Sequence, residues 1–240
     1  MDNDRLDSSI YAAFFNMEHL PFERDLPVDS LCKTTRFTDV IERLKYASDN
    51  QQFAVLTGDI GTGKSTALRA LKETLDPEKY VVLYVSENNL TPRLLYGIPL
   101  DMLGYKPKYN VKDSRKMFQN AIQAEVTLRH KKVVLIVDEA HLVCANKRYE
   151  TLQEIRFLLN NNCDSDNNIA LILAGQNELW DLLGVEKYRA ITQRINFVCK
   201  LHPLTTDEVF DYISAHMRYS KAPDSIFTTE SINLIAAHSK

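Results

Sequence analysis

Residues Gly58-Asp59-Ile60-Gly61-Thr62-Gly63-Lys64-Ser65 decide the fold of this chain, and Thr66 follows them. Their spacing is G-x-x-x-x-G-K-S, the pattern of a phosphate-binding loop. Three of the chain's seven glycines lie in these eight residues, and each lets the backbone approach an oxyanion with its amide groups pointing inward. In such a loop Lys64 reaches the β- and γ-phosphates of a nucleotide and Ser65 holds Mg²⁺.

The residues on either side of the loop support this interpretation. Phe53 to Thr57 form a short apolar run typical of a buried strand, and residues 65–75 have the composition of a helix that Asp76-Pro77 would end. The phosphates would then meet a helix N-terminus, which attracts anions. A chance glycine-rich loop is the alternative, and the full motif between a strand and a helix argues against it.

Length and composition bound the rest of the interpretation. The chain has 240 residues and a net charge of −3, so we expect one large domain or a core with a small appendage. That charge gives no general reason for nucleic-acid binding, although it leaves room for a local basic patch. The scattered cysteines predict neither a disulfide framework nor a zinc site, and they are typical of reduced thiols in a cytoplasmic protein. These cysteines are Cys32, Cys144, Cys163 and Cys199.

Targeting signals are not expected. Residues 1–4 are acidic with no apolar run after them, which argues against a secretory leader. The longest strongly apolar run, residues 133–137, is too short to cross a bilayer. We therefore predict a cytoplasmic protein with no membrane partner.

Apolar runs of strand length alternate with helical patterns through most of the chain. The expected strands are residues 53–57, 80–85, 133–137, 169–174 and 195–199. The expected helices are residues 36–50, 65–75, 91–103, 112–129, 149–159, 178–183 and 185–192. Pro99 should interrupt or kink its helix, Leu128 should face inward, and residues 160–168 should form a polar loop. The alternation predicts an α/β fold, with a parallel five-stranded sheet and helices on both faces.

The pattern changes to helices alone after Leu204. Thr205 and Glu208 form a capping box that should open a helix to Tyr219, and residues 228–238 predict another helix. We therefore expect an N-terminal linker segment over 1–35, a nucleotide-binding core over 36–204, and the start of a helical lid over 205–240 that is cut short. The aromatic residues of the N-terminal segment either pack on the core or close over a nucleotide base.

An acidic pair, Asp138-Glu139, ends the apolar strand 133–137. Downstream of a phosphate-binding loop, such a carboxylate binds the metal, so Asp138 is expected to hold Mg²⁺. Glu139 could accept a proton from the attacking water or orient it. A solvated acidic pair is the alternative, and the upstream loop decides against it. His141 is expected to form local hydrogen bonds rather than to bind a metal.

Two further positions are candidates for catalysis. Gln176 follows the strand 169–174, and its amide would face the γ-phosphate if that strand lies between those carrying the loop and Asp138. Arg194 precedes the last expected strand and could reach a neighbouring subunit's γ-phosphate as an arginine finger, with Arg189 as the other candidate. A plain strand-end glutamine and a surface ion pair are the alternatives.

Several basic groups could meet DNA phosphates, although such groups more often form solvated faces. They are Lys106 and Lys108, Arg115 and Lys116, and Arg129, His130, Lys131 and Lys132.

These motifs together resemble the AAA+ ATPases of the ExeA-like group, which is related to the transposition ATPases of the TnsC, TniB, IstB and MuB kind. The resemblance covers roughly residues 11–238. It rests on Phe14-Phe15-Asn16-Met17 with Pro21-Phe22, Leu56 to Thr66 with Leu68-Arg69, Val137 to Leu142, Leu152 to Asn160, Leu171 to Gln176 with Glu178-Leu179, and Gln193-Arg194-Ile195.

The resemblance implies ATP and Mg²⁺ as cofactors and assigns roles to the candidate residues. Asp138 and Glu139 are the Walker B pair, Gln176 matches the sensor-1 position, and Arg194 matches the candidate finger. The residues implied to bind ATP are Gly58, Asp59, Ile60, Gly61, Thr62, Gly63, Lys64, Ser65 and Thr66. Two departures stand out. Gly97 and Pro99 interrupt a stretch that is usually more regularly helical. The lid's Gly-x-Pro-Arg motif, whose arginine is sensor 2, is expected just after Ala237-His238-Ser239 and is absent before the chain stops at Lys240.

Three functions are compatible with these residues. The first is an ATP-hydrolysing switch for DNA transposition, which would assemble as a ring or filament of identical subunits on double-stranded DNA and recruit or activate a transposase or targeting protein. The second is an ExeA-type ATPase for secretion or envelope assembly. The third is an ATP-binding scaffold with little hydrolysis, against which the intact Lys64, Asp138 and Glu139 argue. A small-molecule kinase would share the loop, but the adjacent Asp138-Glu139 and the helical end favour hydrolysis.

Overall fold

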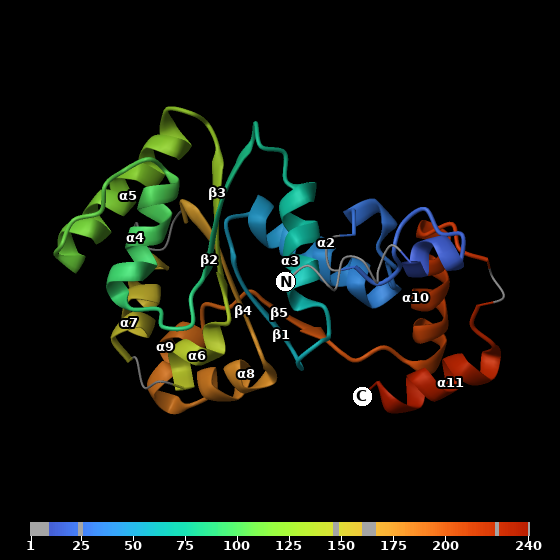
Figure 1. Cartoon of the computed structure of the whole chain (residues 1–240). Helices are drawn as coiled ribbons and strands as arrows, with labels where there is room; N and C mark the ends of the chain where they lie inside the picture. The colour runs from blue at the N-terminus through green and yellow to red at the C-terminus, as the bar shows by residue number, and fades with distance from the viewer. Residues whose placement is uncertain (1–9, 24–25, 146–148, 160–166, 224–225, 240) are drawn as a thin grey trace. The chain divides into compact units, whose positions relative to one another are not determined.

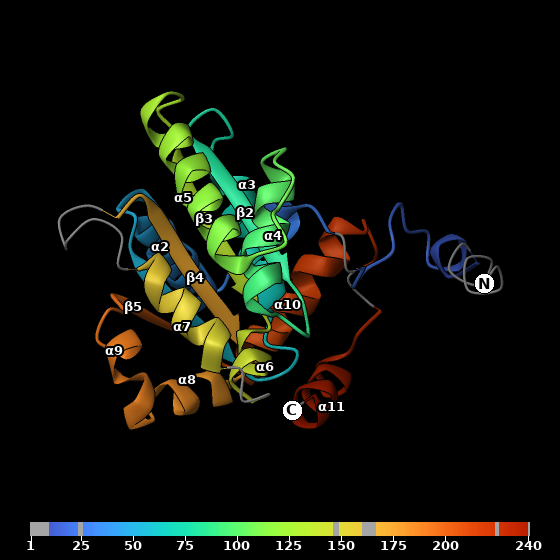
Figure 2. The ribbon, with the colours of Figure 1, turned by 90° about the vertical axis from the view of Figure 1, so that its left-hand side faces the viewer.

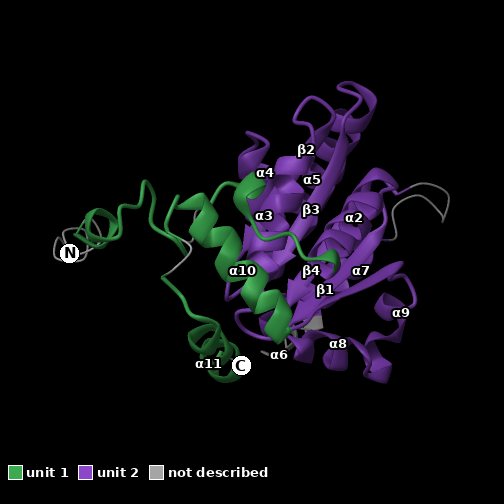
Figure 3. Cartoon of the chain, turned by 90° about the vertical axis from the view of Figure 1, so that its right-hand side faces the viewer, with its two compact units in different colours: residues 1–35, 203–240 green, residues 36–202 purple. Residues whose placement is uncertain are grey.

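The computed structural model describes residues 10–23, 26–145, 149–159, 167–223 and 226–239. The chain divides into two compact units (Figure 3). One unit comprises residues 36–202, and the other comprises residues 1–35 together with residues 203–240. Residues 160–166 of the expected polar loop, the acidic start of the chain and Lys240 lie outside the described residues.

The unit of residues 36–202 is built on a five-stranded sheet in the order β2-β3-β4-β1-β5 (Figure 1). All neighbouring strands are parallel, so the predicted α/β fold is confirmed. The strands are β1 (Phe53–Gly58), β2 (Tyr80–Ser86), β3 (Lys132–Asp138), β4 (Ile169–Gly175) and β5 (Phe197–Leu201). Because all five run in one direction, the residues that follow β1, β3 and β4 meet at one edge of the sheet.

Helices cover both faces of the sheet, and alternate side chains of each strand pack against opposite layers. Val55, Leu135 and Leu171 pack with one layer, whereas Leu56, Ile136 and Ile172 pack with the other. The first layer (Figure 2) consists of α4 (Pro92–Met102), α5 (Val111–Thr127), α6 (Ala140–Ala145), α7 (Tyr149–Leu158), α8 (Asn177–Leu183) and α9 (Arg189–Thr192), with the short η2 (Glu186–Tyr188). The second layer consists of α2 (Thr35–Asp49) and α3 (Lys64–Thr74).

Several details differ from the sequence prediction. Helix α4 continues through Pro99, which is buried, so of the two predicted effects the interruption is wrong. An internal proline costs the helix one backbone hydrogen bond. Leu128, the C-cap residue of α5, is 77% exposed, so the predicted inward position is wrong. Strand β5 begins two residues later than predicted, because the amide of Ile195 still donates to the carbonyl of Thr192.

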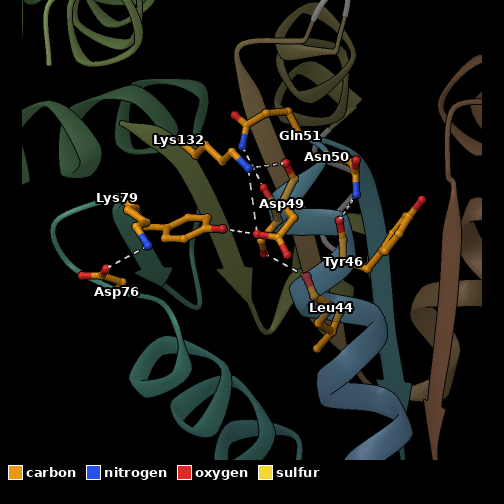
Figure 4. A network of polar contacts seen from close by, with 10 residues as sticks. Leu44, Tyr46, Asp49, Asn50, Gln51, Asp76, Lys79 and Lys132 are labelled. Atoms are coloured by element: carbon orange, nitrogen blue, oxygen red, sulfur yellow. Dashed lines mark hydrogen bonds and ion pairs between the residues drawn. The ribbon is translucent and has the colours of Figure 1, made fainter. Parts of the chain in front are cut away.

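A polar network at the amino-terminal edge of the sheet ties α2 to two strands (Figure 4). Lys132, the first residue of β3, donates from Nζ to the Asp49 carbonyl at 2.8 Å, and its ammonium lies 4.0 Å from the Asp49 carboxylate. The hydroxyl of Tyr80, the first residue of β2, also donates to the Asp49 carboxylate. This network fixes the chain just before β1, opposite the edge where the phosphate-binding loop lies.

The other unit contains η1 (Val28–Ser30), α10 (Thr206–Tyr219) and α11 (Thr229–His238). The predicted capping box is confirmed, since Thr205 accepts from the Glu208 amide and Glu208 accepts from the Thr205 amide. The Phe22 ring stacks on the ring of His216, with centroids 5.0 Å apart, and the Phe22 amide donates to His216 Nδ1 at 3.1 Å. The N-terminal segment thus takes part in the core of this unit.

No helix among the described residues is long and apolar enough to cross a membrane.

Candidate active site

The phosphate-binding loop joins β1 to α3 as predicted. Gly63 caps α3 at a φ of 87° and makes no side-chain capping hydrogen bond, and Gly61 has a φ of 81°. Both values lie in the left-handed region, which glycine adopts without strain. The first-turn amides of α3, including those of Ser65 and Thr66, therefore point toward the loop with no side chain placed to cap them.

Gly58 has a different reason to be glycine. A Cβ placed there would lie 2.6 Å from Thr62 Oγ1 and 2.7 Å from the carbonyl oxygen of Leu201. Leu201 is the β5 residue paired with Gly58. There is therefore no space for a side chain at position 58, where the loop leaves the sheet.

Lys64 lies inside the loop and is only 8% exposed. Its Nζ donates to the carbonyls of Gly58 at 2.8 Å and Asp59 at 2.7 Å. Burial lowers the pKa of Lys64, and the nearby carboxylates of Glu139 and Asp138 oppose that shift. The structure therefore brings Lys64 and the acidic pair together, although they lie more than 70 residues apart in the sequence.

Asp138 ends β3 with a buried carboxylate whose two oxygens each accept a hydrogen bond. The Tyr84 hydroxyl donates to Oδ2 at 2.5 Å, and the Glu139 amide donates to Oδ1 at 2.8 Å. Burial raises the pKa of Tyr84, and its bond to Asp138 adds to that shift. The sequence prediction missed Tyr84; the available signal was a tyrosine in a buried strand, whose hydroxyl needs a partner.

Glu139 follows at a φ of 53°, which is unusual for a residue other than glycine. One oxygen of its carboxylate, Oε2, lies 3.3 Å from His141 Nδ1. His141 belongs to α6, a helix that the sequence prediction did not include. The expectation of local hydrogen bonding by His141 agrees with this contact.

Gln176 follows β4, which lies between β1 and β3 as the sequence argument required. It is half-buried and caps α8 without a side-chain hydrogen bond to that helix. Its neighbour Asn177 donates from Nδ2 to the Asp59 carboxylate at 2.5 Å, so α8 contacts the phosphate-binding loop directly. Two other side chains of the loop have different environments. Thr62 Oγ1 donates to the Asp59 carbonyl at 2.9 Å, whereas the Ile60 side chain is 82% exposed to solvent.

The two candidate arginines lie away from this cluster. Arg194 is just before β5, where the Asn196 amide donates to the carbonyl of Phe53 at the start of β1. The Arg194 guanidinium donates to the Leu159 carbonyl at 2.8 Å. Arg189 is exposed and forms an ion pair with Glu186 at 3.2 Å. Within one chain neither arginine is placed at the phosphate-binding loop.

The residues present suit a magnesium nucleotide. The close approach at Gly58 and the left-handed glycines form a backbone cradle that a Cβ would fill or strain. Mg²⁺ is commonly held by one or two carboxylates together with substrate phosphates. Ser65 and Asp138 are the residues that would hold it.

Comparison with known proteins supports the same assignment. The family described as "AAA domain" matches residues 47–183. General secretion pathway protein A of Aeromonas hydrophila is 27% identical over 229 residues, which cover 94% of this chain and 41% of that protein. The chain thus spans about two fifths of the length of this relative. An uncharacterized ABC transporter ATP-binding protein, YxlF of Bacillus subtilis, is 29% identical over 84 residues, which cover 35% of this chain and 26% of that protein.

Solved structures share the fold at low sequence identity. The ORC2 protein of Aeropyrum pernix in ADPNP-ADP complexes has a TM-score of 0.68 at 14% identity, covering 91% of this chain and 58% of that one. Cdc6p of Pyrobaculum aerophilum has a TM-score of 0.65 at 18% identity, covering 94% and 57%. The Aeropyrum pernix ORC1 protein in complex with DNA has a TM-score of 0.62 at 14% identity, covering 88% and 56%. The family match spans more than half of the chain and includes the phosphate-binding loop, Asp138 and Glu139; the chain therefore belongs to the AAA domain family and is a P-loop ATPase of the AAA+ kind.

Proposed function

We propose that this protein binds ATP with Mg²⁺, hydrolyses it, and uses the nucleotide as a switch for assembly with further copies of itself. One observation carries the proposal. Strand β4 lies between β1 and β3, so the phosphate-binding loop, the Asp138-Glu139 pair and Gln176 share one edge of the sheet. These are the parts that phosphoryl transfer to water requires.

Each residue has a separate task in this proposal. The amides of residues 58–66 bind the phosphates, and Lys64 neutralises charge on the β- and γ-phosphates. A bound Mg²⁺ held by Ser65 and Asp138 supplies further neutralisation of that charge. Glu139 accepts the proton of the attacking water, and the Gln176 amide orients that water.

The test compares ATP binding and phosphate release in three variants. Lys64→Ala should abolish ATP binding, whereas Glu139→Gln should retain binding and lose about a hundredfold or more in turnover. Lys72→Ala removes an exposed lysine from the last turn of α3 and is the matched control, with parental values expected for both measurements. Equal turnover in Glu139→Gln and the parent would remove Glu139 from its role.

Arg194 is proposed to complete the site of a neighbouring copy, with Arg189 as the alternative. Its position beyond the amino-terminal end of β5 supports action between chains rather than within one. Mixtures of Arg194→Ala and Lys64→Ala subunits should recover part of the lost hydrolysis, because some interfaces would then pair an intact loop with an intact arginine. No recovery at any ratio would count against this role, and Arg189→Ala mixtures test the alternative. Thermal unfolding of Arg194→Ala separates this effect from the lost bond to Leu159.

We further propose that the assembly forms on double-stranded DNA through a surface on α4 and α5. An open pocket of about 480 Å³ on α5 and the segment before it is lined in part by Tyr105, Lys108 and Lys116, together with one acidic residue, Asp113. Tyr109, nearby in the chain, is 86% exposed under the Arg93 guanidinium, which lies 5.0 Å from its ring centroid. Exposed lysines beside exposed aromatic rings suit a polyanion.

Three of the other basic groups are already engaged within the chain. Arg115 lies 3.3 Å from Glu154, Arg129 lies 2.6 Å from Glu125, and Lys132 contacts Asp49. The double variant Lys108→Glu/Lys116→Glu should therefore weaken binding to duplex DNA. It should also reduce the slope of log K against log salt by about 2 between about 50 and 200 mM salt, since each phosphate contact contributes about 0.9. Lys45→Glu/Lys72→Glu, on the other face of the sheet, is the matched control, and equal loss in both would refute the surface.

The motif resemblance supports a regulator of DNA transposition as the specific role, one that recruits or activates a transposase. Sizing the protein with a non-hydrolysable ATP analogue, with and without DNA, tests this role. Filaments or rings that need both ligands support it, and monomers under all conditions would overturn it. A secretion role is the second candidate, favoured by the likeness to General secretion pathway protein A over 94% of the chain. Nucleotide-dependent assembly that ignores DNA would favour that candidate.

A further inference from the structure

The Nδ1 atom of His141 faces two partners at once. It lies 3.3 Å from Oε2 of Glu139 and 3.4 Å from the amide nitrogen of Gln176, which is oriented to donate to it. Glu139 is the first residue after β3, and Gln176 is the first residue after β4. One ring nitrogen thus lies between the proposed general base and the backbone of the proposed sensor.

These two contacts exclude each other chemically. A protonated Nδ1 donates to the Glu139 carboxylate but cannot accept from the Gln176 amide. An unprotonated Nδ1 accepts from that amide but offers no hydrogen bond to Glu139. The single proton of the neutral imidazole therefore decides which neighbour is bound.

The ring has little room to leave this position. The His141 side chain is 10% exposed, and a Cβ on Gly175 would lie 3.0 Å from the His141 amide nitrogen and 3.2 Å from Nδ1. Glycine at the end of β4 is what allows α6 to approach so closely. A displacement of the segment Gly175-Gln176 would consequently be felt directly by His141.

The Glu139 carboxylate interacts electrostatically with the Lys64 ammonium, and His141 Nδ1 is a side-chain contact to one of its oxygens. The backbone amide of Glu139 donates a hydrogen bond to Asp138 Oδ1, and the Glu139 side chain is 36% exposed. The His141 contact engages one of the two carboxylate oxygens, Oε2. A general base must be held within hydrogen-bond reach of the proton that it accepts.

We propose that His141 is a positioning residue for Glu139. Its Nδ1–H donates to Glu139 Oε2 and orients the base, and the Gln176 amide competes for the same atom. The tip of β4 thereby controls how firmly Glu139 is held. This inference rests on the proposed ATP hydrolysis, but the contact itself can be tested without turnover.

The first test observes the proton. Imidazole nitrogen NMR of the whole chain reports which ring nitrogen carries it, and His141→Asn identifies the His141 signals. The parent protein should show a protonated Nδ1. Glu139→Ala should move the proton to Nε2, because Nδ1 then accepts from the Gln176 amide. Unchanged His141 shifts in Glu139→Ala would overturn the proposal whether or not the protein hydrolyses ATP.

The second test separates positioning from packing. His141→Ala should lower kcat by about tenfold, a typical cost of losing an orienting partner, while the ATP dissociation constant changes by less than about twofold. His141→Asn, whose amide can donate near the position of Nδ1, should lose less. In Glu139→Gln, adding His141→Ala should cause no further loss, since both changes disable the same step.

Controls guard against a folding defect. His130→Asn, at an exposed position before β3, should leave kcat at the parental value. Gly175→Ala should also lower kcat, because the added Cβ displaces an unaltered His141. Parental kcat in both His141→Ala and Gly175→Ala, or losses that multiply in the Glu139→Gln background, would overturn the proposal. Failure of Glu139→Gln to slow hydrolysis would instead count against the proposed function, and the NMR result would still decide the contact.

Discussion

Replacing Gly58 by alanine tests whether the phosphate-binding loop needs glycine for space or for backbone freedom. The new Cβ would lie 2.6 Å from Thr62 Oγ1, 2.7 Å from the Leu201 carbonyl oxygen and 3.2 Å from Leu201 Cβ. Cβ atoms in proteins do not approach other atoms closer than 3.0 Å, so part of the structure must shift. The carbonyl belongs to β5, which is paired with β1, whereas Asp59, Ile60 and Gly61 are exposed. The loop should move rather than the strands.

Overpacking of this kind costs about 1–3 kcal/mol. If the loop takes up the displacement, ATP affinity should fall by about 5- to 150-fold. The free energy of unfolding should change less. Titration with a fluorescent ATP analogue gives the first quantity, and urea denaturation gives the second.

Gly61 provides the contrast. No atom lies within 4 Å of a Cβ at this position, and the φ of 81° is the only obstacle. Gly61→Ala should therefore cost about 1–2 kcal/mol of backbone strain. Gly61→Asn should recover part of that cost, because asparagine tolerates left-handed backbone. At Gly58 the larger asparagine should be worse than alanine. Parental ATP affinity in Gly58→Ala, or recovery by Gly58→Asn, would refute the steric explanation.

Three further predictions concern stability. Tyr84→Phe removes the hydrogen bond to the buried Asp138 carboxylate, so the free energy of unfolding at neutral pH should fall by about 1.5 kcal/mol or more; in an Asp138→Asn background, urea denaturation should show a smaller loss. Burial lowers the pKa of His216, so protonation favours the unfolded chain: stability is retained above the ordinary value of 6.5 and falls as the pH drops below it. The slope should reach at most about 1.4 kcal/mol per pH unit, and His216→Phe should remove it in urea titrations across this range. Leu128→Lys should change stability by less than about 0.5 kcal/mol, whereas Ile122→Ala, in the core face of α5, should cost about 2–5 kcal/mol; a large loss from Leu128→Lys would show that its side chain is covered.

The sequence predicted the features that depend only on residues close to one another in the chain. The glycine spacing of the loop needs only its neighbours, and the apolar runs that became β1, β3 and β4 are long enough to identify by themselves. The same holds for the capping box at Thr205, whose two hydrogen bonds join residues three apart.

The features that were missed depend on partners far along the chain. Tyr84 gains its role from Asp138, 54 residues later, and His141 gains its role from a glycine on β4. The continuity of α4 through Pro99 depends on packing around it rather than on propensity. The start of β5 shifted because the turn after α9 kept its own hydrogen bonds. A local sequence pattern cannot predict any of these contacts unless the order of the strands in the sheet is already known.

The strand order also has a consequence for synthesis of the chain. Among the described strands β1 pairs with β4 and β5, so this fully buried strand has no partner on either side when it leaves the ribosome. The last residue of β4, Gly175, lies 117 residues after Gly58, and translation at about 5–20 residues per second needs about 6–23 s to reach it. During that interval β2 and β3 can already pair with each other, while an unpaired edge is prone to join other chains. The strand that carries the phosphate-binding loop is therefore the segment of the nascent protein for which a chaperone would matter most.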